Sequence, residues 1–146
     1  MIEKSQLQHL VEVMDRLRSS GGCPWDAEQT HESLLTYLIE ESYEFIDAVE
    51  RSDRADMLEE LGDILLQVVF HARIASEESG AAFDIEDVAN GISNKLISRH
   101  PHVFSEEKQL TPSEVEVNWE KIKSAEKDRK SAGDGVPLGQ PALALA

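Results

Sequence analysis

Carboxylates recur at helical spacing in two neighbouring stretches of this sequence. The first stretch reads Glu40-Glu41-x-x-Glu44, and the second reads Glu60-x-x-Asp63. Because residues three and four apart share one face of an α-helix, each stretch would present its acids side by side. An acidic arc on a single amphipathic helix is usually only its solvated face, since charged side chains mostly lie outside. The first stretch alone therefore indicates no particular chemistry.

The second stretch favours a metal site. Apolar residues across positions 57–74 occupy nearly the whole circumference of the expected helix, which is typical of a buried helix. One narrow polar stripe interrupts them, and it consists of Glu60, Asp63, Gln67 and His71. A histidine on a buried helix is more often structural than functional, so both interpretations of His71 stay open. Buried carboxylates are costly unless they are paired or bind a metal, and these two therefore need a cation.

A divalent metal ion is the cation that fits these carboxylates. Arg51, Arg54 and Arg73 do not repeat in step with the acids. Like charges about 4 Å apart repel by roughly 4 kcal/mol at an effective dielectric of 20, so converging carboxylates need a positive charge between them. Mg²⁺ is usually held by a few carboxylates together with substrate phosphates. The His-Pro-His run at 100–102 is a poor zinc site, because no further Cys or His lies at ligand spacing.

The composition limits the partners of the chain. It has 14 Lys and Arg against 29 Asp and Glu, a formal net charge of −15. Such a chain would repel a nucleic-acid polymer, which proteins bind mainly through basic side chains. A small phosphorylated ligand remains compatible with this charge if a divalent cation mediates. The single Cys23, together with the absence of a long apolar run or signal-peptide core, predicts a soluble, cytoplasmic protein with no membrane partner.

The spacing of apolar residues predicts an all-α fold. Helices are expected at residues 7–17, 30–51, 54–79, 84–100 and 111–127, with a turn at 23–26. Asp84 and Thr111 are the predicted N-caps of the last two helices. The fourth helix would bury Ile85, Val88, Ala89, Ile92 and Leu96. No stretch predicts a strand, and the Gly-, Pro- and Ala-rich residues 128–146 are expected to be loosely ordered, so the chain is predicted to be a helical bundle.

Basic and aromatic residues elsewhere could bind phosphates or a nucleotide. Lys95 and Arg99 are one helical turn apart, and so are Trp119 and Lys123. The basic pair could equally be solubilising surface residues, and Trp119 is in line with apolar positions that would pack. Trp25 could cap the core or stack on a base. Residue type and spacing leave these alternatives open.

Taken together, these motifs resemble the MazG-type nucleoside triphosphate pyrophosphohydrolases. The acidic signature EExxE…ExxD, with fifteen residues between its halves, runs from Glu40 to Asp63. The surrounding sequence is similar too, at residues 23–34, 59–75, 95–104, 118–127 and 134–137. The likeness covers most of the chain in order. Ser98 is a departure, because relatives often have Arg there, and many relatives carry a second copy of the domain.

The resemblance implies a four- to five-helix bundle over residues 1–127, assembled as a homodimer or higher homo-oligomer by bundle packing, with a tail at 128–146. It implies Mg²⁺-dependent hydrolysis of NTPs or dNTPs to the monophosphate and pyrophosphate, clearing excess or non-standard nucleotides, with Mn²⁺ as a substitute metal. The implied metal ligands are Glu41, Glu44, Glu60 and Asp63. Glu40 would orient or deprotonate the attacking water. The implied substrate contacts are Lys95, Arg99 and Lys123 to phosphates and Trp119 to the nucleotide, with Trp25 as a further candidate.

Two other functions remain compatible with the residues. One is a related enzyme with a narrower substrate, such as dUTP or phosphoribosyl-ATP. The other is a non-catalytic, acidic helical interaction module whose carboxylates only keep it in solution.

Overall fold

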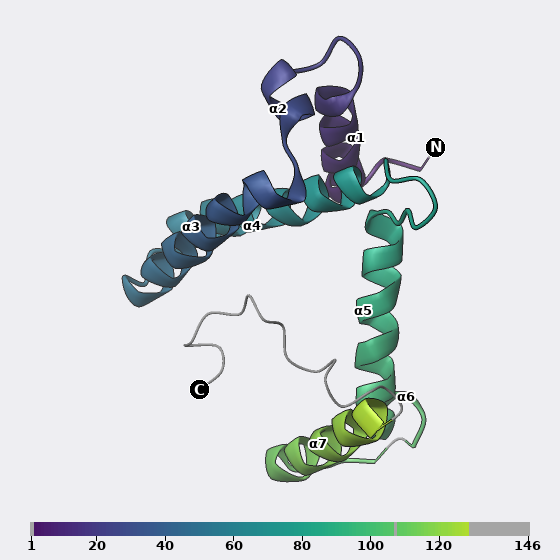
Figure 1. The fold of residues 1–146 in the computed structure, drawn as a ribbon. Coiled ribbons are helices and arrows are strands. Elements are labelled where there is room, and N and C mark those ends of the chain that lie inside the picture. Colours follow the sequence, from purple (N-terminus) through teal and green to yellow (C-terminus); the bar gives the residue numbers. More distant parts are fainter. Residues whose placement is uncertain (1, 107, 129–146) are drawn as a thin grey trace. The chain divides into compact units, whose positions relative to one another are not determined.

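The chain folds into helices joined by short loops (Figure 1). The computed structural model describes residues 2–106 and 108–128. It contains α1 (Gln6–Arg18), α2 (Pro24–Glu28), α3 (His31–Glu50), α4 (Arg54–Ala75), α5 (Ile85–Arg99), α6 (Pro101–Phe104) and α7 (Pro112–Asp128). The described residues include no strand, which confirms the predicted all-α fold. None of these helices is long and apolar enough to cross a bilayer.

The chain divides into two compact units, and the division falls between Ala89 and Asn90, within α5. The first unit holds α1 to α4, and the second holds most of α5 together with α6 and α7. The expected tail at 128–146 lies outside the described residues, apart from Asp128, which ends α7.

Helix α1 ends where its sequence predicts, at the Ser-Ser-Gly-Gly run. Gly21 has a φ of +82°, in the left-handed region that favours glycine. A Cβ at Gly22 would lie 2.3 Å from the carbonyl oxygen of Arg16, so only glycine fits this close approach. The turn expected next is instead the short helix α2. Pro24 stands at its first position, where the fixed φ of proline suits a helix and its missing N–H costs nothing.

Helices α3 and α4 form an antiparallel hairpin and lie side by side along their length (Figure 1). Thr30 begins α3 with a reciprocal capping box to Ser33. At the tip of the hairpin, Arg51 forms ion pairs with Asp47, Asp53 and Asp56. These local bonds fix the register of the two helices at the tip.

Helix α4 ends at Ala75, four residues before the predicted end at residue 79. The Ser76 hydroxyl donates to the carbonyl oxygen of Arg73 over 2.6 Å, and the Ser76 N–H bonds back to Ala72 and Ile74. A serine that bonds its own turn offers the backbone an alternative to further helix. The polar residues that follow contribute no apolar periodicity that would oppose this early end.

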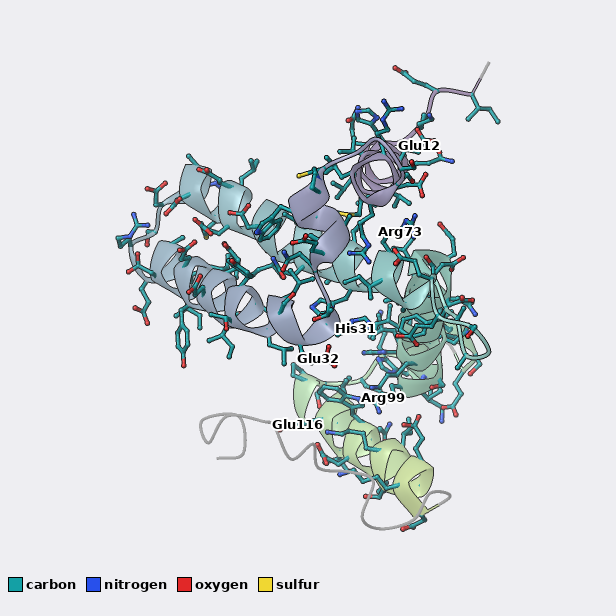
Figure 2. All side chains as sticks on the ribbon, turned by 45° about the horizontal axis from the view of Figure 1, so that its top comes forward. Glu12, His31, Glu32, Arg73, Arg99 and Glu116 are labelled. Atoms are coloured by element: carbon teal, nitrogen blue, oxygen red, sulfur yellow. The ribbon has the colours of Figure 1, made fainter. Side chains whose placement is uncertain are left out.

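The core of the first unit forms where α1, α3 and α4 meet. Its buried side chains are Met14, Leu34, Val69, Phe70 and Ile74. Arg73 reaches from α4 to α1 (Figure 2), where its Nε donates to Asp15 over 3.1 Å. Burial of α4 around its whole circumference was predicted and is wrong for the single chain, because Leu58 and Leu61 are 77% and 51% exposed. Only the C-terminal half of α4 carries buried residues.

Helices α5 and α7 have the predicted caps, but α5 lacks the predicted buried face. Asp84 and Asp87 cap the start of α5 through reciprocal bonds of 3.0 Å, and Thr111 caps α7 through a 3.2 Å bond from the Glu114 N–H. The expected core face of the fourth helix is wrong for this chain, in which Val88, Ala89, Ile92 and Leu96 are exposed. Ile85 alone of that set packs against the core. Helix α6 was not predicted, since four residues are too few to show a helical period.

Candidate metal centre

The α3–α4 hairpin brings four of the five signature carboxylates together. Glu41 and Glu44 of α3 and Glu60 and Asp63 of α4 each offer one oxygen, and these oxygens all lie within 4.8 Å of one another. Spacings of three residues on both helices place each pair on one face, and the antiparallel hairpin turns the two faces toward each other. Glu40 is exposed and is not part of this cluster.

Burial and mutual repulsion perturb the protonation of the acidic cluster. The pKa of Glu60 is raised to about 7, first because burial penalises its charge and then because Glu44 lies within hydrogen-bonding distance and adds negative charge. Burial likewise raises the pKa of Glu41, with further contributions from Asp63 and Glu44. Carboxyl groups held close together in this way cannot all ionise without a compensating cation.

The described part of the chain supplies no such cation to the cluster. No Lys, Arg or His within residues 2–106 and 108–128 forms an ion pair with any of the four carboxylates. The Oε2 atoms of Glu41 and Glu60 are buried without a hydrogen-bond partner. Buried polar atoms are normally satisfied, so these two oxygens indicate a missing positive ligand.

A hard divalent cation fits this donor set. All four donors are carboxylate oxygens, which Mg²⁺ and Ca²⁺ prefer, and no sulfur or nitrogen ligand is present in the cluster. Opposite ligands of an octahedral Mg²⁺ lie about 4.2 Å apart, because each bond is about 2.1 Å long. The 4.8 Å limit on the oxygen separations is close to that span, so small side-chain rotations would complete a site.

The second unit gathers three of the predicted substrate-binding residues. The Arg99 guanidinium lies 5.9 Å from the centre of the Trp119 ring, and the Lys123 ammonium lies 5.2 Å from it. Arg99, whose side chain is only 12% exposed, also pairs with Glu126 over 2.9 Å. Cations at these distances are attracted to the indole face. Lys95 is exposed, and its backbone oxygen accepts a hydrogen bond from the Ser98 hydroxyl over 3.0 Å.

Trp25 belongs to the first unit and stands on α2. Its ring is half exposed and meets Tyr37 of α3 edge to face, with 6.0 Å between ring centres. Trp25 therefore does not cap the core, which was one of the two roles its sequence position allowed. An exposed indole face remains able to stack on a planar ligand.

A histidine pair closes the opposite end of the hairpin from Arg51, and sequence reasoning missed it. The Nδ1 atoms of His31 and His71 lie 2.8 Å apart with the two rings stacked in parallel, and His31 Nε2 lies 3.4 Å from Glu78. Burial and the neighbouring His31 lower the pKa of His71. The pair was foreseeable only from the register of the hairpin, because an antiparallel register that joins Glu41 to Glu60 also brings His31 to the level of His71.

The sequence model of the MazG nucleotide pyrophosphohydrolase domain matches residues 29–104, which is more than half of the chain. The chain belongs to the MazG family. The matched range contains the whole acidic cluster, together with Lys95 and Arg99, whereas Trp119 and Lys123 lie beyond it.

Curated MazG relatives are similar over nearly the whole chain. The chain is 51% identical over 142 residues to the nucleoside triphosphate pyrophosphohydrolase/pyrophosphatase MazG of Thermotoga maritima, covering 95% of this chain and 53% of that protein. It is 46% identical over 146 residues to the nucleoside triphosphate pyrophosphohydrolase of Escherichia coli K12, covering 97% of this chain and 55% of that protein. The chain thus spans about half the length of these relatives.

A solved structure shares the fold. The crystal structure of a mazG-related protein from Thermotoga maritima matches with a TM-score of 0.66 and 31% sequence identity, covering 80% of this chain and 98% of that one. The helical architecture of this MazG domain is therefore that of an experimentally known relative.

Proposed function

We propose that this MazG domain hydrolyses nucleoside triphosphates, NTPs or dNTPs, to the nucleoside monophosphate and pyrophosphate in a Mg²⁺-dependent reaction, with Mn²⁺ able to substitute. The observation that carries the proposal is the acidic cluster, in which four carboxylate oxygens lie within 4.8 Å of one another. The relatives that are named nucleoside triphosphate pyrophosphohydrolases support it.

Glu41, Glu44, Glu60 and Asp63 would hold the metal ion. When bound, Mg²⁺ would neutralise the triphosphate oxygens and the charge that develops on the pyrophosphate leaving group. In the reaction, the oxygen of a water molecule attacks the α-phosphorus, and the bond from that phosphorus to the bridging oxygen of the β-phosphate breaks. Glu40, exposed beside Glu41 on α3, is the proposed group that orients or deprotonates this water.

Other side chains of the protein would position the substrate. Lys95, Arg99 and Lys123 are proposed to contact phosphates, because such groups stabilise charge on a transferring phosphoryl group. Trp119 keeps Arg99 and Lys123 together through its ring, and we propose that it also borders the nucleotide. Trp25 is proposed to stack on the base through its exposed ring. Positioning and electrostatics, rather than covalent catalysis, are the work left to the protein in such reactions.

We also propose that the protein acts as a homodimer or higher homo-oligomer in the cytoplasm. The hairpin exposes many large apolar side chains, namely Leu35, Ile39, Tyr43, Ile46, Leu58 and Leu61. Extensive exposed apolar surface marks an interface in proteins of this kind. A second hairpin packed on the first would cover it and complete a bundle.

The test is a pyrophosphate-release assay over the four NTPs and four dNTPs, with Mg²⁺ and with EDTA, with the products separated by chromatography. We expect monophosphate and pyrophosphate to form only with Mg²⁺, and Glu41→Gln to abolish turnover while helicity by circular dichroism is unchanged. Glu59→Gln is the matched control, because Glu59 is exposed on α4 and outside the cluster.

Four results would count against the proposal. Release of orthophosphate instead of pyrophosphate would reject the reaction, and full activity in Glu41→Gln would reject the metal assignment. Both dUTP and phosphoribosyl-ATP are added to the panel. Turnover of either one alone would favour the enzyme with a narrower substrate. No turnover and no Mg²⁺-dependent rise in melting temperature with nucleotide would favour the interaction module, since a ligand of the folded state must stabilise it.

A further inference from the structure

The polar stripe of α4 continues beyond the acidic cluster with two more unsatisfied atoms. Gln67 is 6% exposed and is the buried polar residue of the core region, yet its Oε1 has no hydrogen-bond partner within the described part of the chain. The Nε2 atom of His71 is also buried without a partner. Metal binding at the acidic cluster accounts for Glu41 and Glu60 but not for these two atoms.

An unsatisfied buried amide is expensive and calls for an explanation. Leaving such a group without a partner costs about 1–3 kcal/mol, and an apolar side chain of similar shape would avoid that cost. The Gln67 carbonyl oxygen can only accept, so the missing partner must be an N–H or O–H donor. Nothing in the helix hairpin supplies one to it.

The position of Gln67 relates this missing donor to the acidic cluster. Asp63, Gln67 and His71 follow one another at four-residue steps on one face of α4. With a rise of 1.5 Å per residue, Gln67 lies about 6 Å along the helix from Asp63, and His71 about 12 Å. A molecule whose phosphates are held at the acidic cluster would extend past these two side chains. Of the α3 residues that flank this face, Glu44 is exposed and the side chain of His31 is 36% exposed.

We propose that Gln67 and His71 bind the nucleoside part of the substrate, with a base N–H or a ribose O–H donating to Gln67 Oε1, and that they set nucleotide selectivity. This inference rests on the proposed function for its substrate class. Both residues are binding residues, since neither lies at the reacting phosphate.

His71 suits this role because its Nε2 atom can either donate or accept a hydrogen bond. At 2.8 Å, one proton lies between the Nδ1 atoms of His31 and His71. When His31 carries that proton, neutral His71 bears its own on Nε2 and donates; when His71 carries it, Nε2 accepts. His71 can therefore meet a donor or an acceptor on a base edge, whereas Gln67 Oε1 demands a donor.

The experiment compares the wild type with Gln67→Met, which keeps the length of the side chain and removes its polar atoms. Gln8→Met is the matched control, because Gln8 is exposed on α1 and its side chain forms no hydrogen bond within the described part of the chain. For each protein, kcat/KM is measured for the pairs CTP and UTP, ATP and ITP, and ATP and dATP. The first two pairs report on a base group, and the third reports on the ribose hydroxyl.

Loss of the contact should change at least one of these ratios about tenfold in Gln67→Met and none in Gln8→Met, because tenfold corresponds to about one lost hydrogen bond of 1.4 kcal/mol. The melting temperature of Gln67→Met without ligand should equal or exceed that of the wild type. A common factor for every nucleotide, or no change, would overturn the inference and leave an ordered water as the partner of Gln67.

A separate readout keeps this inference distinct from the proposed function. Thermal shifts with AMP, CMP and UMP plus Mg²⁺ are recorded for the wild type and Gln67→Met. If the wild type hydrolyses no triphosphate, the proposed function fails, and the inference is then decided by binding. A monophosphate-induced shift that disappears in Gln67→Met supports it, and an equal shift in both proteins overturns it.

Discussion

At the scale of single residues, the acidic cluster stores electrostatic free energy that binding of a cation would release. The raised pKa of Glu60 and Glu41 has its origin first in burial and then in the neighbouring carboxylates. The pKa of Glu77, just beyond the end of α4, is shifted in the opposite direction. The Arg18 guanidinium donates hydrogen bonds to this carboxylate and lowers its pKa. Glu77 therefore has a cationic partner within the fold, whereas the four clustered carboxylates have none among the described residues.

The stability of the metal-free protein should fall as the pH rises from about 4.5 to about 7. Over this range folded Glu60, with its pKa of about 7, holds a proton that the unfolded chain, with the ordinary value of 4.5, has released. The folded state binds more protons, so the free energy of unfolding decreases with pH. Glu77 acts in the opposite sense, but only as the pH falls below about 4.5.

Denaturant unfolding in EDTA across pH 4.5–8 measures this slope. Glu60→Gln should flatten it, because glutamine does not titrate, and saturating Mg²⁺ should flatten it in the wild type near neutral pH. A wild-type stability that rises through this window in EDTA would contradict the account of the cluster.

At the scale of helices, Arg18 ties three elements of the first unit together. Its side chain is only 7% exposed, and its guanidinium donates to both carboxylate oxygens of Glu77 and to the backbone oxygens of Asp26 and Gln29. Helices α1 and α2 and the end of α4 thus share one cation. The guanidinium also lies over the Phe70 ring, 5.9 Å from its centre.

Removing this cation should destabilise the fold without touching the acidic cluster. Arg18→Met is expected to lower the free energy of unfolding by about 2 kcal/mol, because two carbonyls and a carboxylate lose a nearly buried donor, discounted for the partly exposed Glu77. Arg16→Met, an exposed position on the same helix, is the control. Urea denaturation that finds equal losses for both variants would show that Arg18 has no special role.

Local sequence patterns predicted the long helices, but they did not predict where every helix begins and ends. The caps at Asp84 and Thr111 are short-range bonds that depend only on neighbouring residues, so the sequence predicted them. Helix α2 was not predicted, because five residues are too few to show a helical period. The predicted end of α4 was too late in the sequence, because the Ser76 side chain competes for a carbonyl of the last turn.

The same distinction applies to the site. Helical spacing predicted that Glu41 and Glu44, and separately Glu60 and Asp63, would share faces, and the hairpin joined them. The contact between His31 and His71 depends on the register of two helices over their whole length, which no local pattern encodes. Residues that meet across the fold are therefore the part that spacing alone could not supply.

At the scale of the whole molecule, the α3–α4 hairpin carries large apolar side chains that the single chain leaves exposed. The sequence correctly marked Leu58 and Leu61 as apolar positions, but residue type does not say whether the same chain or another covers them. With a net charge of −15, two copies repel at long range, so association must come from apolar burial.

A charge placed at this surface should dissociate the proposed homo-oligomer. Leu58→Glu is expected to convert the protein to a monomer by light scattering at micromolar concentration, because burying an unpaired carboxylate costs more than the apolar contact contributes. Leu7→Glu, an exposed leucine on α1, should leave the assembly unchanged. A wild type that is already monomeric would contradict the proposal.

The central claim is that four carboxylates on two helices bind a divalent cation. Titration of Mg²⁺ into the protein by calorimetry tests this claim most directly. The wild type and Glu59→Gln should bind alike, and binding should weaken at least tenfold in each of Glu41→Gln, Glu44→Gln, Glu60→Gln and Asp63→Asn, with helicity retained. Wild-type affinity in all four cluster variants would contradict the account.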